Sequence, residues 1–424
     1  MTTTHALKQP DALQGVRDAL DALAPILPPT PLQVNQFLSD RYGCNIYLKR
    51  EDLTPVRSYK IRGAFNFFRK ALVADSPPAG FVCASAGNHA QGFSYACHYF
   101  NKSGVVFMPV TTPQQKIDKT KAFGQGHVEV HLVGDTFDVC NRAALAYAEQ
   151  NGCLMVPPFD HADVIEGQAT VGLEILDAAI FDVDVLIVPV GGGGLSSGLV
   201  EVFRELSPKT EIKFVEPVGA PSLKTSLEAG KHVVLENINT FVDGAAVAAI
   251  GALNFERLKH VDPSSVLLIN EDALCETIFE FLNIEGIVLE PAGALTMDAL
   301  RQLPADYLKG KNVVCVTSGG NFDFERLPEV KERALKAAGL KKYFILRLPQ
   351  RPGALKDFLN ALGPDDDIAR FEYLKKSARN FGHILIGIEA KNTASFPLLF
   401  KRMDELGYTY KDITNDESVA SFII

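Results

Sequence analysis

"VDVLIVPVGGGGLSSG" stands at residues 183–198 and joins an apolar run to a set of glycines. The run 183–190 is rich in β-branched residues, which is typical of a buried strand. Four consecutive glycines follow it: Gly191, Gly192, Gly193 and Gly194. Glycine lets the backbone approach an anion closely, and the start of the next helix adds its dipole. The stretch therefore predicts a strand, a loop that binds a phosphorylated ligand, and a helix, and it argues against a flexible linker.

The same alternation of strand and helix recurs along the chain on both sides of this stretch. Strand-like runs stand at 80–85 (GFVCAS), 104–109 (GVVFMP), 127–134 (HVEVHLVG) and 312–320 (NVVCVTSGG). The first three precede segments of helical length, and residues 58–72 (SYKIRGAFNFFRKAL) form another such segment, in which Gly63 permits close packing. Repeated strand–helix units predict an α/β fold with a largely parallel sheet.

The texture of the sequence changes after about residue 327. A charged helix is expected over 327–340 (LPEVKERALKAAGL), and the remaining residues alternate as βαββαβ, with a helix near 395–406 and a last strand that ends in SVASFII. This order is the ferredoxin-like plan. We therefore expect one domain over residues 1–330 and a second part, the connector helix and a small domain, over 331–424.

The bulk properties exclude several classes of protein. The net charge is −9, and the absence of long basic runs argues against a nucleic-acid surface. No apolar stretch reaches the roughly 18 residues that span a membrane, and the polar N-terminus resembles neither a signal nor a transit peptide. The seven cysteines are scattered without a CxxC pair, and no metal-binding motif is visible. These features predict a cytoplasmic protein without a nucleic-acid surface, a membrane span or a metal-binding side-chain motif, and they leave open a cation bound through carbonyl groups.

Two further loops carry polar groups where a strand gives way to a helix or a turn. Residues 85–92 (SAGNHAQG) offer Ser85, Gly87, Asn88 and His89, a set that suits a carboxylate at a helix N-terminus. The alternative is an ordinary capping turn. Residues 316–323 (VTSGGNFD) place Ser318 at the carboxyl end of a strand, where ligands bind in open α/β sheets; a plain turn is the alternative there.

Lys60 stands in SYKIRG (58–63), at the start of the predicted helix and just after a likely strand. By itself it could be a solvated helix residue. In combination with two anion-binding loops and a hydroxyl at a strand end, however, it suits a Schiff base to an aldehyde cofactor that bears a phosphate. This combination indicates pyridoxal 5′-phosphate.

Five stretches, in this order, resemble the biosynthetic threonine dehydratases of the fold type II group of pyridoxal-phosphate enzymes. They are KREDLTPVRSYKIRGAFNF (49–67), SAGNHAQGFSYAC (85–97), VPVGGGGLSSG (188–198), EPAGA (290–294) and VTSGGNFD (316–323). The tail, above all ILRLPQRPGALKDFLNALG (345–363), resembles the regulatory ACT-like domain of these enzymes, in a single copy. The resemblance implies two open α/β subdomains with parallel sheets and a ferredoxin-like regulatory domain.

The resemblance also implies a role for each candidate site residue. Lys60 is the lysine that bonds to the cofactor aldehyde, and Tyr59, where phenylalanine is common, lies against the cofactor ring. Asn88 binds the phenolic oxygen, and Ser318 faces the pyridine nitrogen. The substrate carboxylate is held by the loop of Ser85, Gly87, Asn88 and His89. The phosphate is held by the backbone of Gly191, Gly192, Gly193, Gly194 and Leu195.

The activity implied is the conversion of L-threonine to 2-oxobutanoate and ammonia, the first step of isoleucine synthesis, with Lys60 as the base. Isoleucine is the implied effector, with valine as a second candidate and RPGAL (351–355) as a candidate contact, and a homotetramer is the usual assembly. A serine dehydratase or racemase of the same fold is the alternative. A non-catalytic amino-acid sensor and a nicotinamide enzyme are less favoured, the latter because no dinucleotide fingerprint is present.

Overall fold

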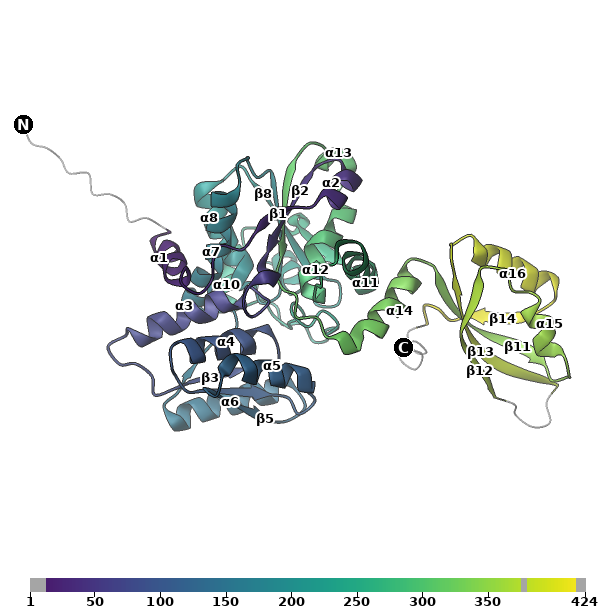
Figure 1. Ribbon diagram of the computed structural model, residues 1–424, viewed down its shortest axis with the longest axis horizontal. Coiled ribbons are helices and arrows are strands. Elements are labelled where there is room, and N and C mark those ends of the chain that lie inside the picture. The colour runs from purple at the N-terminus through teal and green to yellow at the C-terminus, as the bar shows by residue number, and fades with distance from the viewer. Residues whose placement is uncertain (1–12, 375–379, 417–424) are drawn as a thin grey trace, which may run out of the picture. The chain divides into compact units, whose positions relative to one another are not determined.

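The computed structural model describes residues 13–374 and 380–416, which form two compact units (Figure 1). The first unit comprises Met1–Glu271 and Ile287–Phe322, and the second comprises Asp272–Gly286 and Asp323–Ile424. The chain thus enters the second unit for a short stretch, returns to the first, and leaves it again. The boundary at residue 330 expected from the sequence stays a prediction.

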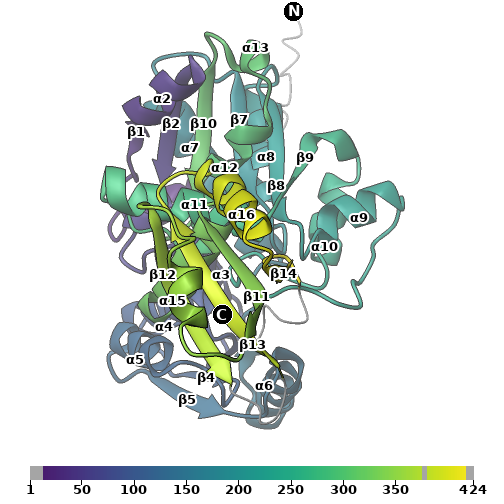
Figure 2. The same ribbon diagram turned by 90° about the vertical axis from the view of Figure 1, so that its right-hand side faces the viewer.

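The larger sheet of the first unit contains, among the described residues, six strands in the order β1-β2-β10-β7-β8-β9, which Figure 2 shows side by side. All neighbours are parallel except β1, which pairs antiparallel with β2. The parallel sheet expected around residues 183–190 and 312–320 is thereby confirmed. The strands are β1 (Leu32–Val34), β2 (Asn45–Arg50), β7 (Val185–Pro189), β8 (Glu211–Pro217), β9 (Val266–Ile269) and β10 (Asn312–Thr317).

The smaller sheet of the first unit is parallel throughout, in the order β5-β4-β3-β6. Its two central strands are buried along their whole length, as the apolar runs predicted. Two parallel sheets in one unit agree with the fold expected from the resemblance. The strands are β3 (Phe81–Ala84), β4 (Gly104–Met108), β5 (Val128–Leu132) and β6 (Leu154–Met155).

Helices surround both sheets of the first unit (Figures 1 and 2). The helix expected over 58–72 begins two residues later, at Lys60. The α-helices are α1 (Gln14–Leu23), α2 (Gln36–Tyr42), α3 (Lys60–Leu72), α4 (Asn88–Tyr99), α5 (Gln114–Gly124), α6 (Phe137–Asn151), α7 (Ala162–Ala178), α8 (Gly194–Leu206), α9 (Ser222–Glu228), α10 (Ala252–Leu258), α12 (Pro291–Asp298) and α13 (Ala305–Leu308). Short 3₁₀ turns are η1 (Glu51–Leu53), η2 (Pro263–Ser265) and η4 (Ala299–Gln302).

Glycine allows α3 and α7 to approach each other closely. A Cβ added at Gly167 would lie 2.5 Å from the carbonyl oxygen of Arg62 and 2.8 Å from the Cα of Gly63. A Cβ at Gly63 would meet the side chain of Gln168 at 2.3 Å. The two helices therefore meet backbone to backbone, and α7 supports the first turns of α3.

The second unit contains the ferredoxin-like plan, and this expectation is confirmed. Its antiparallel sheet has the order β12-β13-β11-β14, and Figure 2 shows β11, β12 and β13 beside one another. The elements are α11 (Glu271–Glu280), the π-helical turn η3 (Phe281–Glu285), η5 (Phe324–Arg326), α14 (Leu327–Ala337), β11 (Lys341–Pro349), α15 (Ala354–Leu359), β12 (Asp366–Leu374), β13 (Phe381–Ala390), α16 (Ser395–Glu405) and β14 (Thr409–Asp412). The strand expected at SVASFII lies outside the described residues.

Within the second unit, ion pairs and hydrogen bonds join the connector helix α14 to two other elements, α11 and β11. Arg333 pairs with Asp272 at 2.8 Å, which links α14 to α11. Glu332 accepts a hydrogen bond from the Lys341 ammonium at 2.5 Å and another from the Tyr343 hydroxyl at 2.8 Å, which links α14 to β11. The helix is therefore a structural part of the second unit.

The close contact of α3 with α7 predicts a large effect of one methyl group. In Gly167→Ala the new Cβ meets backbone atoms that cannot rotate away, so we expect a loss of about 2–3 kcal/mol in the free energy of unfolding. Urea unfolding measures it. The control is Ala162→Ser at an exposed position of the same helix, which should change the value by less than about 0.5 kcal/mol. Equal stability of the two variants would contradict the packing described.

Candidate active site

The loop that precedes Lys60 is joined to the loop that follows β10. The N–H of Tyr59 donates to the carbonyl oxygen of Ser318 at 3.2 Å, and the N–H of Gly320 donates to the carbonyl oxygen of Arg57 at 2.9 Å. The Nδ2 of Asn321 donates to the carbonyl oxygen of Val56 at 2.8 Å. Two of the predicted stretches, far apart in sequence, therefore lie together at the carboxyl end of the larger sheet.

Lys60 is the first residue of α3 and is half-buried. Its Nζ donates to the carbonyl oxygen of Pro158 at 2.9 Å and lies 5.3 Å and 5.8 Å from the ring centres of Tyr59 and Phe159. Burial lowers the pKa of Lys60 to about 8, and the Glu290 carboxylate partly opposes this by raising it. The amine is therefore neutral in a sizeable fraction of molecules near neutral pH, as a nucleophilic lysine requires.

The glycine loop lies between β7 and α8, as expected. Within the described residues, the N–H groups of Gly191, Gly192 and Gly193 donate no hydrogen bond. A Cβ at Gly192 would lie 2.2 Å from the ring of Phe159, and Gly193 has a φ of 87°, which favours glycine. Leu195, in the first turn of α8, is buried in the core. The loop thus offers N–H groups without a hydrogen-bond partner, at the start of a helix, where an anion can bind.

Asn254 was not singled out from the sequence, yet it holds this loop in place. Its Nδ2 donates to the carbonyl oxygens of Gly192 at 2.8 Å and Phe159 at 3.2 Å. Since Phe159 also contacts Lys60, Asn254 ties the glycine loop to the surroundings of the lysine. Nothing in the sequence around "ALNFERL" signals this role, because the contact exists only in the folded chain.

The loop before α4 has room for a ligand. The Ser85 Oγ accepts a hydrogen bond from the N–H of Gly87 at 3.2 Å, and neither side chain of Ser85 nor Asn88 caps the helix. A Cβ placed on Gly87 would meet no atom within 4 Å. No side chain therefore caps α4, and the space beside Gly87 is open.

His89 is neutral and its ring is already engaged. Its Nε2 donates to the carbonyl oxygen of Val156 at 2.9 Å, which fixes the tautomer because a carbonyl only accepts. Burial, and next the positive charge of Lys60, lower the pKa of His89 to about 3. Any role of His89 toward a carboxylate therefore belongs to its backbone N–H and not to a charged imidazole.

Asn88 is held from two sides by residues that sequence reasoning did not assign. Its Nδ2 donates to Glu290 Oε1 at 2.7 Å, and its Oδ1 accepts from Asn321 Nδ2 at 2.8 Å. Burial, with the charge of Asp243 as the second cause, raises the pKa of Glu290 to about 7. The motif EPAGA (290–294) contains Glu290. An acidic residue directly before a helix start, inside a motif already singled out, was the sequence signal that could have pointed to it.

Ser318 is buried at the end of β10, where the sequence placed it. Its Oγ donates to the carbonyl oxygen of Ala292 at 3.2 Å. A Cβ at the following Gly319 would lie 2.0 Å from Glu290 Oε1, so any side chain there would displace the Glu290 carboxylate from its present place. The expected residues therefore converge on one site, with an amine, unpaired N–H donors and a strand-end hydroxyl. This donor set fits an aldehyde cofactor that carries a phosphate.

Comparison with known families agrees with this site. The family model described as pyridoxal-phosphate dependent enzyme matches residues 23–319, and the model for the C-terminal regulatory domain of threonine dehydratase matches residues 332–423. The biosynthetic L-threonine dehydratase IlvA of Halalkalibacterium halodurans is 46% identical over 413 residues, 97% of this chain and 99% of that protein. The chain belongs to the biosynthetic threonine dehydratases. Its cofactor is pyridoxal phosphate.

Other members of this family are similar over comparable lengths. The IlvA protein of Bacillus subtilis is 45% identical over 421 residues, which cover 99% of this chain and 97% of that protein. The processed form of threonine deaminase isoform 2 from Solanum lycopersicum superposes with a TM-score of 0.69 at 38% identity, over 76% of this chain and 88% of that one. The resemblance stated from the sequence is therefore confirmed.

Within residues 13–374 and 380–416, no group of three or more His, Cys, Asp or Glu side chains could hold a metal ion. In the same part of the chain, no helix combines the length and the apolar character needed to cross a lipid bilayer.

The lowered pKa of Lys60 predicts how cofactor uptake depends on pH. Only the neutral amine reacts with an aldehyde, so the rate at which the cofactor-free chain takes up pyridoxal phosphate should rise about tenfold per pH unit below pH 8 and level off above it. Absorbance of the bound cofactor measures this rate, with Nα-acetyl-lysine as the reference for an ordinary amine.

Glu290→Gln provides the matched variant. The Glu290 carboxylate raises the pKa of Lys60, so its removal should shift the midpoint below that of the unmodified chain. A midpoint near 10.5 in the unmodified chain, the ordinary value for lysine, would show that burial does not act on Lys60 as described.

Proposed function

We propose that this chain converts L-threonine to 2-oxobutanoate and ammonia with pyridoxal phosphate, as the first step of isoleucine synthesis. The observation that carries the proposal is the half-buried Lys60 amine beside two sets of backbone N–H donors, in a chain that also carries a threonine dehydratase regulatory domain. The relatives named above carry this activity in their names.

Different residues of the chain bind different parts of the cofactor in this proposal. Lys60 Nζ would bond to the aldehyde, and the N–H groups of Gly191 to Leu195 would hold the phosphate. Asn88, which Glu290 and Asn321 orient, would donate to the phenolic oxygen, and Tyr59 would provide the ring contact. Ser318 would offer the ring nitrogen a hydroxyl, which carries no charge and would not keep a proton on that nitrogen as a carboxylate does.

The substrate is bound and deprotonated by groups of the first unit. The carboxylate of threonine binds the N–H groups of the Ser85–His89 loop at the start of α4, where Gly87 leaves open space. The cofactor, when bound, withdraws electrons from the Cα of the amino acid joined to it. The Lys60 amine would then be the base that takes the Cα proton of the substrate, since its lowered pKa makes it a base near neutral pH. Loss of the β-hydroxyl as water, then hydrolysis, gives 2-oxobutanoate and ammonia.

The remaining parts of the proposal concern regulation and setting. The domain over 331–424, with α14 as connector, binds isoleucine or valine and controls the domain over 1–330. The family match over residues 332–423 supports a regulatory role. A cytoplasmic homotetramer completes the proposal, by analogy with the family.

The decisive assay follows 2-oxobutanoate from L-threonine across an isoleucine titration. We expect turnover in the unmodified chain, inhibition by isoleucine at constant threonine, and a loss of at least about 10³-fold in kcat for Lys60→Ala, because both the covalent bond and the base are removed.

Activity on L-serine and D-serine in the same assay tests the alternative. A higher kcat/KM for L-serine to pyruvate, or interconversion of the serine enantiomers without threonine turnover, would replace the proposed function by a serine dehydratase or racemase. Threonine turnover that is indifferent to isoleucine and valine would contradict the proposed effectors alone.

A further inference from the structure

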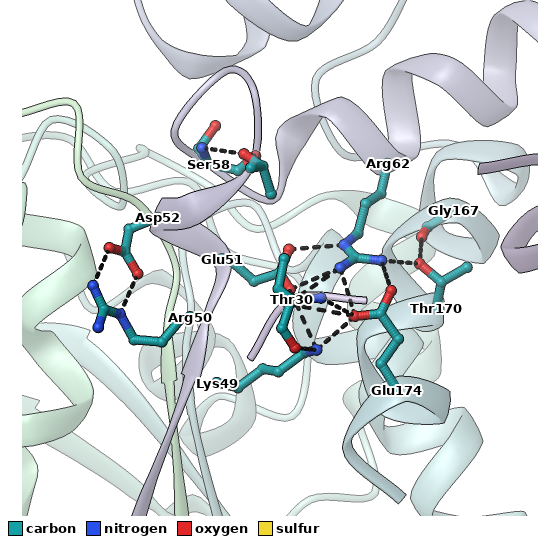
Figure 3. A network of polar contacts seen from close by, with 11 residues as sticks. Thr30, Lys49, Arg50, Glu51, Asp52, Ser58, Arg62, Gly167, Thr170 and Glu174 are labelled. Carbon is teal, nitrogen blue, oxygen red and sulfur yellow. Dashed lines mark hydrogen bonds and ion pairs between the residues drawn. The ribbon is translucent and has the colours of Figure 1, made fainter. Parts of the chain in front are cut away.

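Four charged side chains are buried together behind the helix that begins at Lys60 (Figure 3). Lys49, Glu51 and Arg62 are fully buried, and Glu174 is 4% exposed. They come from the end of β2, from η1, from α3 and from α7. None of them was assigned a role above, and none contacts the loops proposed to hold cofactor or substrate.

Arg62 uses every donor of its guanidinium. Nε and Nη2 donate to the two oxygens of Glu51 at 2.7 Å and 2.9 Å. Nη1 and Nη2 donate to the two oxygens of Glu174 at 2.6 Å and 2.9 Å, and Nη1 also donates to Thr170 Oγ1 at 3.0 Å. A planar group with five donors in a fixed fork is thereby locked in position and orientation.

Lys49 and Thr30 complete the charge balance and the hydrogen bonding. Lys49 Nζ donates to Glu174 at 2.5 Å and to the carbonyl oxygen of Thr30 at 2.7 Å. Thr30 Oγ1 donates to Glu51 at 2.5 Å, and the N–H of Thr30 donates to Glu174 at 3.1 Å. Two positive and two negative groups therefore neutralise each other through direct hydrogen bonds.

The ion pair of Glu51 and Arg62 joins the two ends of the segment 51–62, which contains Lys60. Residues two apart on a helix point in nearly opposite directions, so Arg62 points into the network while Lys60 points toward Pro158. Arg62 can therefore act on Lys60 only through the backbone of the first turn of α3. The Gly167 contact against the Arg62 carbonyl holds the same turn from the other side.

The closed segment is under local strain that needs such support. Arg57 has a φ of 61°, in the left-handed region that non-glycine residues rarely adopt. Thr54 Oγ1 donates to the carbonyl oxygen of Ser58 at 2.8 Å and accepts from its N–H at 2.9 Å, which forms a second, inner closure. Residues 51–62 are thus fixed at both ends and in the middle.

Stability alone does not account for this network. Burying four charges is costly, and apolar residues of similar volume often stabilise a protein as well or better. Bidentate bonds between a guanidinium and carboxylates add geometric specificity, because they fix the orientation of the groups they join. Here that geometry coincides with the helix end that carries the reactive lysine.

We propose that the Lys49–Glu51–Arg62–Glu174 network is a positioning device, in which Arg62 fixes the first turn of α3 and so sets the place of the Lys60 amine. This inference rests on the role of Lys60 proposed above. Arg62 is a positioning residue and not a catalytic one, since its side chain bonds to Glu51, Glu174 and Thr170 and to no residue of the proposed cofactor site or substrate loop.

The main variant combines Arg62→Met with Glu174→Leu, which removes one positive and one negative group and leaves Lys49 and Glu51 3.9 Å apart as a pair. We expect a melting temperature close to that of the unmodified chain, but a midpoint for pyridoxal phosphate uptake raised by more than 0.5 pH unit. The reason is that a displaced Lys60 amine is better solvated. In the loaded enzyme kcat should fall at least tenfold, with KM changed less.

Arg62→Lys is the second variant, which keeps the charge but loses the fork. It should shift the midpoint in the same direction by a smaller amount, and it keeps the test valid if the double variant does not fold. Glu216→Gln is the control, since Glu216 is a fully buried carboxylate that accepts from the N–H groups of Leu223 and Lys224, away from the network. It should lower the melting temperature and leave the midpoint at its original value.

A folded double variant, or a folded Arg62→Lys, with the original midpoint and the original kcat would overturn the proposal. So would a control variant that shifts the midpoint as much as they do. The uptake midpoint is read on the cofactor-free chain, so it stays informative if L-threonine is not the substrate. Failure of the proposed function would appear separately, as an absence of 2-oxobutanoate with the unmodified chain.

Discussion

One buried guanidinium determines much of the arrangement around Lys60. Because Arg62 has all five donors engaged by Glu51, Glu174 and Thr170, the elements that carry these groups cannot shift independently. Hydrophobic packing alone permits small slides between helices, whereas a bidentate contact in the plane of a fork does not. Burying these charges costs free energy, but it fixes the position of the first turn of α3, which begins at Lys60.

Glycine serves the same purpose at several other contacts of the first unit. At Gly167, Gly192 and Gly319 a single methyl group would separate parts that the site requires in contact: two helices, a loop and an aromatic ring, and a strand end and a carboxylate. These positions need no left-handed backbone, and their constraint is space. The site is therefore shaped as much by the absence of side chains as by the groups that do the chemistry.

The sequence predicted the parts of the site that are local in the chain. Lys60, the loop of Gly191 to Gly194 and Ser318 each stand at a strand–helix junction, and a junction is legible from a short window. Glu290, Asn321 and Asn254 were missed because their partners lie far away along the chain. The strands of the fold followed the same rule: long apolar runs were found, whereas β1, with two of its three residues exposed, has no apolar pattern to read.

The junction between the loop at Lys60 and the loop at Ser318 has a consequence for the order of events during synthesis. The hydrogen bond from the N–H of Tyr59 to the carbonyl oxygen of Ser318 cannot form until the ribosome has added Ser318, roughly 260 residues later. At about 5–20 residues per second this interval lasts on the order of 13–50 s. During that time β2 has no β10 beside it, because the central strand of the larger sheet is among the last parts of the first unit to be made. The nascent chain therefore lacks the neighbour of β2 for most of its translation, and an unpaired strand edge is a template for pairing with other chains.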